Sequence, residues 1–233
     1  MYEPEFHRYS TGETLAQSLS QRIAAALADT IDSDGQAVIG VSGGSTPKAM
    51  LRDLSHQPID WSSVTVTLVD ERFVRPSNER SNQRLVAMHL LQNKAAFARF
   101  IPLFRKDLAA AEAAAQAARD INALGKPPDV IVLGMGTDGH TASWFPGSPD
   151  LAKLTDPHQT ASVLSADAPG QPEMRLSMTL PIIARSKLTI LHIEGEDKMK
   201  VLEEALETGS TAQLPVRAVL RRTDPPLQIY WAP

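Results

Sequence analysis

Two glycine-rich segments in this sequence each follow an apolar run. The first, Ser42-Gly-Gly-Ser-Thr-Pro47, comes after the apolar residues 37–41. Glycine lets successive backbone N–H groups point in one direction, and the hydroxyl groups add further donors. We expect Pro47 to be the first residue of a helix and Thr46 its N-cap, so that the positive helix end faces the same point. The segment favours a phosphate site over an ordinary strand-to-helix turn, and it lacks the longer nucleotide-binding pattern G-x-x-x-x-G-K-[ST].

The second segment, Gly134-Met-Gly-Thr-Asp-Gly-His140, contains G-x-G-x-x-G after the apolar residues 129–133. In dinucleotide-binding sites this spacing opens a long helix, and an acidic residue ends a second strand about 20 residues later. Here Pro146 and Pro149 interrupt any long helix, and Asp156 lies outside strand-like sequence. We therefore interpret these glycines as allowing close approach of the backbone to a small ligand.

His140 is the side chain of this segment best suited to proton transfer. Histidine titrates near neutral pH and can both take and give a proton. Asp138 lies two residues earlier and could orient the imidazole. The alternative is a histidine that only caps the turn. The other histidines lack a glycine-rich setting, and we expect one of them, His192, to be an ordinary strand residue.

Charged residues outside the two segments are weaker candidates. Asp70-Glu-Arg72 follows the apolar residues 64–69 and precedes Ser81-Asn82. A charge cluster is usually a solvated surface feature, but its place at a strand end favours a functional role. Arg175 and Lys198 are isolated cations, and Lys198 lies where a helix begins after a strand, which suits an anion site.

Strand-like and helix-like segments alternate along the chain. This alternation predicts an α/β fold, a parallel sheet with helices on both faces, in a single domain over residues 1–233. We expect Ser42, Asp70 and Gly134 to converge, because each follows a strand and ligands bind beyond the carboxyl ends of such strands. The expected strands are residues 37–41, 64–69, 99–104, 129–133, 160–164, 187–193 and 227–231. The expected helices are residues 11–29, capped by Ser10 and Glu13, a helix containing Leu85, Met88 and Leu91, a helix from Asp107 to near Gly125, and residues 196–208 and 216–221. The segments 70–81 and 134–149 are expected to be loops.

Composition excludes several classes of protein. The 233 residues carry a net charge of −4 and include no cysteine. Nucleic-acid binding usually needs a basic patch, so we expect none. Without cysteine there is no disulfide, thiolate zinc site or cysteine nucleophile, and no histidine pair has helical zinc spacing, so we expect no metal and no cofactor. The N-terminus resembles no signal peptide and no apolar run is long enough for a membrane helix, which predicts a cytoplasmic protein without a membrane partner.

Taken in order, these segments resemble the 6-phosphogluconolactonases of the glucosamine-6-phosphate isomerase superfamily. The resemblance implies a doubly wound, Rossmann-like fold without nucleotide or metal. It also implies hydrolysis of 6-phosphoglucono-δ-lactone to 6-phosphogluconate in the oxidative pentose phosphate pathway. The residues that carry it are Ser42–Pro47, Asp70-Glu-Arg72, Ser81-Asn82, Gly134–Ser143 with Phe145-Pro-Gly147, Arg175 and Lys198.

The resemblance assigns roles to individual residues. His140 would be the general base with Asp138 beside it, and Arg72 would act near the carbonyl, since a permanent cation can stabilise an oxyanion. The expected substrate-binding residues are Ser42, Gly43, Gly44, Ser45 and Thr46 with Arg175 and Lys198 for the phosphate, together with Asp70, Asn82 and Gly136. Trp144 departs from the leucine usual in the family, and we expect it to alter the pocket wall.

Two rival functions are weaker. A glucosamine-6-phosphate deaminase–isomerase typically has an asparagine–glutamate–proline segment after the histidine, where this chain has Ser143-Trp-Phe-Pro146. It also tends to have tyrosine in place of Arg72. A ribose-5-phosphate isomerase is more distant. A non-catalytic sugar-phosphate sensor is usually fused to a DNA-binding helix-turn-helix, for which this chain shows no segment.

Overall fold

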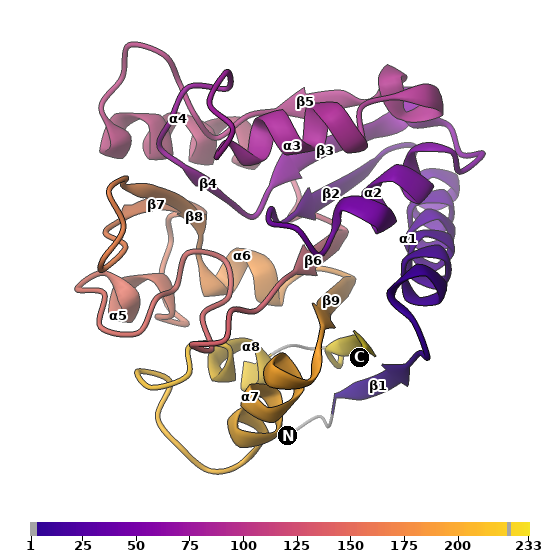
Figure 1. Cartoon of the computed structure of the whole chain (residues 1–233). Helices are drawn as coiled ribbons and strands as arrows, with labels where there is room; N and C mark the ends of the chain where they lie inside the picture. Colours follow the sequence, from indigo (N-terminus) through magenta and orange to yellow (C-terminus); the bar gives the residue numbers. More distant parts are fainter. Residues whose placement is uncertain (1–3, 223–224) are drawn as a thin grey trace.

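A parallel sheet of seven strands runs through the centre of the protein (Figure 1). The computed structural model describes residues 4–222 and 225–233. Every neighbouring pair in this sheet is parallel, as the alternating sequence predicts. In spatial order the strands are β1 (Glu5–Arg8), β10 (Gln228–Ala232), β9 (Leu188–Glu194), β6 (Val130–Leu133), β2 (Ala37–Val41), β3 (Val64–Leu68) and β5 (Arg99–Ile101).

Helices cover the sheet. Figure 1 shows α1 and α2 on one side of the central strands and α6 on the other. The apolar faces of these helices join the sheet residues in one cluster of buried hydrophobic side chains. The predicted α/β fold is confirmed. The helices are α1 (Gly12–Asp34), α2 (Lys48–Ser55), α3 (Asn82–His89), α4 (Ala110–Asn122), α5 (Leu151–Leu154), α6 (Leu180–Ala184), α7 (Glu196–Leu206) and α8 (Arg217–Arg222), with 3₁₀ turns at Trp61–Ser63 and Asn93–Phe97.

A second, antiparallel sheet has the order β4-β8-β7. Its strands are β4 (Asp70–Arg72), β8 (Arg175–Met178) and β7 (Val163–Ala166). The predictions of a loop over residues 70–81, of no strand at β8 and of a strand over 160–164 in place of β7 are wrong. The reason is that β4 is short and charged, and becomes a strand only by pairing with β8, where Asp70 lies opposite Ser177. Because the two strands are about a hundred residues apart in the chain, their pairing produces no pattern in the local sequence of either one.

Several predicted helix and strand ends also need correction. Thr11, not Ser10, caps α1, because its Oγ1 accepts the Thr14 N–H at 3.2 Å, and the helix continues to Asp34. Pro47 is the N-cap of α2 rather than its first helical residue. Asp107 does not cap α4, which begins three residues later at Ala110. The short strand β1 was not predicted; it pairs with β10 at the edge of the sheet.

Candidate active site

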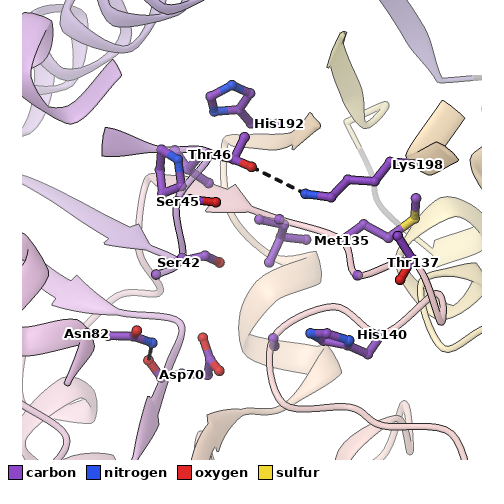
Figure 2. Close-up of a pocket in the computed structure, with 18 of the residues that line it drawn as sticks. Ser42, Ser45, Thr46, Asp70, Asn82, Met135, Thr137, His140, His192 and Lys198 are labelled. Carbon is purple, nitrogen blue, oxygen red and sulfur yellow. Dashed lines mark hydrogen bonds between the residues drawn. The ribbon is translucent and has the colours of Figure 1, made fainter. Parts of the chain in front are cut away.

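A cavity of about 320 Å³ opens at the carboxyl ends of β2 and β6 (Figure 2). These strands are neighbours, but the chain continues from β2 to β3 on one side and from β6 to β9 on the other. The two loops therefore diverge and leave a crevice, as ligand sites in open α/β sheets require. The structure brings most of the predicted site residues to this cavity, namely Ser42, Gly43, Gly44, Ser45, Thr46, Asp70, Arg72, Asn82, Gly136, His140 and Lys198. Asp138 and Arg175 are not among the lining residues.

The loop after β2 contains a hydrogen-bonding group that has no partner in the described part of the chain. The Ser42 Oγ is buried and has no hydrogen-bond partner among the described residues. A Cβ added to Gly43 would lie 1.8 Å from the Asn82 Oδ1, so only glycine fits at this close approach. Asn82 is itself held by its Nδ2, which donates to the Asp70 carbonyl at 2.9 Å. A buried polar group without a partner is costly, which indicates that a ligand completes this loop.

Lys198 brings a positive charge to the same loop. It lies in the first turn of α7, and its Nζ donates to the Thr46 Oγ1 at 3.3 Å (Figure 2). Burial lowers the pKa of Lys198, and the nearby Glu194 carboxylate acts in the opposite direction. A half-buried ammonium group beside serine and threonine hydroxyls and a helix N-terminus suits an anionic ligand.

His192 also lines the cavity, although the sequence predicts only an ordinary strand residue there. It is a residue of β9, as predicted, but its Nε2 lies 3.1 Å from the Glu194 Oε1. This hydrogen bond lowers the pKa of Glu194. The position of His192 near the carboxyl end of a strand, just before the segment of Lys198, was the signal that could have revealed it.

The His140 imidazole is held in a tight turn at the lower edge of the cavity (Figure 2). Its Nδ1 lies 2.6 Å from the Asp138 Oδ1. A Cβ on Gly136 would lie 2.3 Å from the ring, so this glycine allows the imidazole to sit against the backbone. The ring of Phe145 packs beside it, with 4.5 Å between centroids.

The pairing with Asp138 decides which nitrogen of His140 is available. Burial raises the pKa of Asp138, whereas the hydrogen bond to His140 and the charge of His140 lower it. The lowering is larger, so the pKa of Asp138 lies below its ordinary value. Asp138 is therefore an anion near neutral pH and accepts the Nδ1 hydrogen. A neutral imidazole bonded in this way carries a lone pair on Nε2, which can take a proton from water.

The three charged residues of β4 divide between the two faces of the strand, because side chains alternate. Asp70 and Arg72 line the cavity, whereas Glu71 does not. The Asp70 Oδ2 accepts the Ser143 hydroxyl at 2.6 Å, and the Arg72 Nη1 donates to the Asn82 Oδ1 at 3.1 Å. These contacts hold one carboxylate and one guanidinium at the cavity wall.

Glu71 has a structural role at the start of α3. Its carboxylate accepts the backbone N–H groups of Arg72, Asn82 and Gln83 and the hydroxyl of Ser81. Burial raises the pKa of Glu71, and these four donors act against that rise. A carboxylate at a helix N-terminus also interacts favourably with the helix dipole. Glu71 therefore holds α3, and with it Asn82, against β4.

Two further residues lie outside the cavity. Trp144 is fully buried and its Nε1 donates to the Met178 carbonyl at 2.9 Å, so the side chain does not itself line the pocket. Its indole packs into the core instead. Arg175 is also buried, and its Nη1 donates to the Glu173 carbonyl at 3.2 Å.

The described residues show neither a metal-binding cluster nor a membrane-spanning helix. Within residues 4–222 and 225–233, no three or more histidine, cysteine, aspartate or glutamate side chains are grouped so that they could hold a metal ion. In the same part of the chain, no helix combines the length and the apolar character needed to cross a bilayer.

Comparison with known proteins establishes the family. The model of the glucosamine-6-phosphate isomerases/6-phosphogluconolactonase family matches residues 10–231, and the chain belongs to this family. The chain is 50% identical over 227 residues to a 6-phosphogluconolactonase of Rhizobium meliloti (strain 1021), covering 97% of this chain and 98% of the relative. It is 44% identical to that of Pseudomonas aeruginosa over 218 residues, covering 94% and 90%.

Solved structures agree in fold. The crystal structure of a 6-phosphogluconolactonase from Shewanella baltica OS155 matches with a TM-score of 0.95 at 38% identity, covering 99% of this chain and 98% of that one. A monomeric glucosamine-6-phosphate deaminase matches with a TM-score of 0.79 at 19% identity. The second likeness is one of fold alone.

Proposed function

We propose that this protein is an enzyme that hydrolyses 6-phospho-D-glucono-1,5-lactone to 6-phospho-D-gluconate in the oxidative pentose phosphate pathway. The observation that carries the proposal is that His140, which is paired with Asp138, lines the same cavity as the Ser42–Thr46 loop and Lys198. Relatives named 6-phosphogluconolactonase, up to 50% identical over nearly the whole chain, support the same reaction.

The phosphate of the substrate would bind between the loop Ser42–Thr46 and Lys198. The buried Ser42 hydroxyl without a partner and the N-terminus of α2 supply donors, and Lys198 supplies charge. The resemblance to the family adds Arg175 to this subsite, although its guanidinium lies outside the cavity lining. Asp70, Asn82 and Gly136 line the remaining wall, where they can contact the sugar.

The lactone would be opened by a water molecule activated by His140. Nε2 takes a proton from the water as its oxygen bonds to the carbonyl carbon of the lactone. The carbonyl oxygen becomes an oxyanion, which the Arg72 guanidinium stabilises. When the intermediate collapses, the bond from this carbon to the ring oxygen breaks and His140 returns the proton to that oxygen. Asp138 keeps the imidazole in the required tautomer throughout.

An assay on the purified protein tests this function. Fresh 6-phosphoglucono-lactone is supplied, and the rate of spontaneous hydrolysis is subtracted. We expect saturable hydrolysis of the lactone and no release of ammonia from glucosamine 6-phosphate, the substrate of the rival activity. A rate equal to the spontaneous one, with the phosphorylated sugar still bound, would favour the sensor instead.

We also propose that the reaction needs neither metal nor redox cofactor and takes place in the cytoplasm. The chain has no cysteine, which fits a reducing compartment, and the donors at the proposed site are nitrogen and oxygen groups already placed for acid–base chemistry. We expect full activity in EDTA and without NAD(P). Tight binding of NADP in a calorimetric titration would contradict this and restore the dinucleotide interpretation of residues 134–139.

A further inference from the structure

Arg175 occupies an unusual position for a residue expected to hold phosphate. It is the cross-strand partner of Arg72 in the pairing of β4 with β8. Partners directly opposite in an antiparallel pair place their side chains on the same face. Yet Arg72 lines the cavity, whereas Arg175 does not and is only 3% exposed. Arg72 therefore faces the cavity, whereas the side chain of Arg175 is buried beside it.

The Arg175 guanidinium contacts Glu173 and Phe145, and it interacts electrostatically with Arg72 and Asp70 on the cavity wall. Nη1 donates to the Glu173 carbonyl at 3.2 Å and lies 3.5 Å from the Glu173 Oε2. Its Cζ lies 5.8 Å from the centroid of the Phe145 ring. A cation over an aromatic ring at this distance is attracted to it, and more strongly when both are desolvated. Arg175 is thus positioned to hold the Phe145 ring in place.

Phe145 connects Arg175 with the reacting residue. The Phe145 and His140 rings are 4.5 Å apart at their centroids. The Asp138 carboxylate fixes one nitrogen of His140. It does not by itself fix the tilt of the imidazole, because a ring can rotate about a single hydrogen bond. The close approach to the Gly136 backbone and the contact with Phe145 supply further constraints on that tilt.

We propose that Arg175 is a positioning residue, which holds Phe145 against the His140 imidazole, and not a ligand of the phosphate. The inference rests on the proposed function, since it assigns His140 the role of base. It separates two cations that the family resemblance places together: Lys198 binds the substrate, and Arg175 acts on the chemical step. Misplacing a catalytic group by about 1 Å can cost on the order of 100-fold in rate.

Substitution of Arg175 distinguishes a ligand from a positioning residue. Arg175→Met keeps much of the side-chain length and removes the charge, and Lys198→Met is the matched control at the phosphate loop. We expect Arg175→Met to lower kcat by about tenfold and to leave the inhibition constants of 6-phosphogluconate and inorganic phosphate within about twofold of wild type. Lys198→Met should instead weaken inhibition by both anions and leave kcat close to the wild-type value. Arg175→Lys retains a cation near Phe145 and should recover part of kcat.

A double-mutant cycle tests the route through Phe145. Phe145→Leu should lower kcat without weakening inhibition by phosphate. Adding Arg175→Met to Phe145→Leu should then cost little more, because both changes remove the same constraint. If Arg175→Met fails to fold, Arg175→Lys takes its place: a lower kcat with unchanged inhibition by phosphate supports the inference, and weaker inhibition by phosphate at unchanged kcat contradicts it.

Two outcomes would overturn the inference. Loss of phosphate and product affinity in Arg175→Met at unchanged kcat would show that the guanidinium turns into the cavity and binds phosphate. Fully additive effects of Arg175→Met and Phe145→Leu would show that they act separately. In both cases the wild-type protein still hydrolyses the lactone, whereas an inactive wild-type protein would count against the proposed function itself.

Discussion

The polar groups at the two ends of the central sheet differ in whether they have partners within the protein. At the amino end, the buried Asp129 accepts the Val38 N–H at 2.8 Å and pairs with Lys126 at 3.0 Å and Lys187 at 3.4 Å. Lys187 also lies 2.7 Å from Asp34. At the carboxyl end, by contrast, the loops after β2 and β6 line an open cavity that contains a buried hydroxyl without a partner.

This difference suggests that the amino end of the sheet contributes mainly to stability and the carboxyl end mainly to function. At the amino end, charges and donors satisfy one another, so a ligand would gain little by binding there. At the carboxyl end, the fold leaves the buried Ser42 hydroxyl without a partner among the described residues and places the half-buried Lys198 ammonium beside hydroxyl groups, which costs stability that a bound anion can recover. Changes at the first end should therefore alter unfolding and leave turnover intact, and changes at the second should do the reverse.

The largest effect is expected from His140. His140→Ala removes the proposed general base, and loss of such a group typically lowers the rate by about 10²–10⁴-fold. The side chain is partly exposed, so the midpoint of thermal unfolding should change little. Steady-state kinetics and a melting curve on the same sample measure both. A folded variant with most of the wild-type kcat would move the search for the base to Asp70, the carboxylate on the cavity wall.

A smaller loss is expected at Lys198. Hydrogen bonds to charged groups contribute roughly 1.5–3 kcal/mol, so Lys198→Ala should raise KM and the inhibition constant of 6-phosphogluconate about tenfold or more. Since burial lowers the pKa of Lys198, the wild-type KM should also begin to rise at a pH below that usual for lysine. The rise comes from loss of the ammonium charge. An unchanged KM in the variant would exclude Lys198 from the phosphate subsite.

The opposite behaviour is expected at Asp129. Asp129→Ala leaves the Val38 N–H buried without its acceptor and removes the partner of two lysines. The free energy of unfolding should fall by about 1–3 kcal/mol, the usual cost of an unsatisfied buried donor. Chemical denaturation measures this change, and kcat should stay at the wild-type value. A stable variant with impaired turnover would mean that the two ends of the sheet are coupled.

The smallest effect is expected from the exposed pair of Asp34 and Lys187. Hydrogen bonds from Lys187, Ser33 and Lys126 lower the pKa of Asp34 well below its ordinary value of 3.8. The folded state therefore binds this proton less readily than the unfolded chain does. The resulting stability is present above about pH 4 and is lost as the pH falls through the lowered value.

Lys187→Met tests this dependence. The variant should be slightly less stable than wild type at pH 7, and the difference should shrink as the pH falls below 4, where protonation removes the contribution from both proteins. Denaturation curves across this range, with kcat at neutral pH as the control, provide the measurement. A difference in stability that stays constant into strong acid would show that Asp34 does not carry the effect.

The sequence by itself determined the alternation of strands and helices and the two glycine-rich loops. Runs such as Ala37–Val41 and Val130–Leu133 are apolar throughout, which suits strands buried on both faces. Gly136 and His140 could be selected because the glycine spacing and the titratable side chain are local features. Such features depend on backbone sterics and burial over a few residues, so they can be read without knowing the fold.

Only the tertiary structure decided which side chains face one another. It turned Asp70 toward the cavity and Glu71 toward α3, buried Trp144 in the core, brought His192 to the cavity and placed Arg175 over the ring of Phe145. Each outcome depends on the pairing of β4 with β8 or on the packing of segments far apart in the chain. Such contacts form between segments that are far apart in the chain, so the sequence of one segment alone does not predict them.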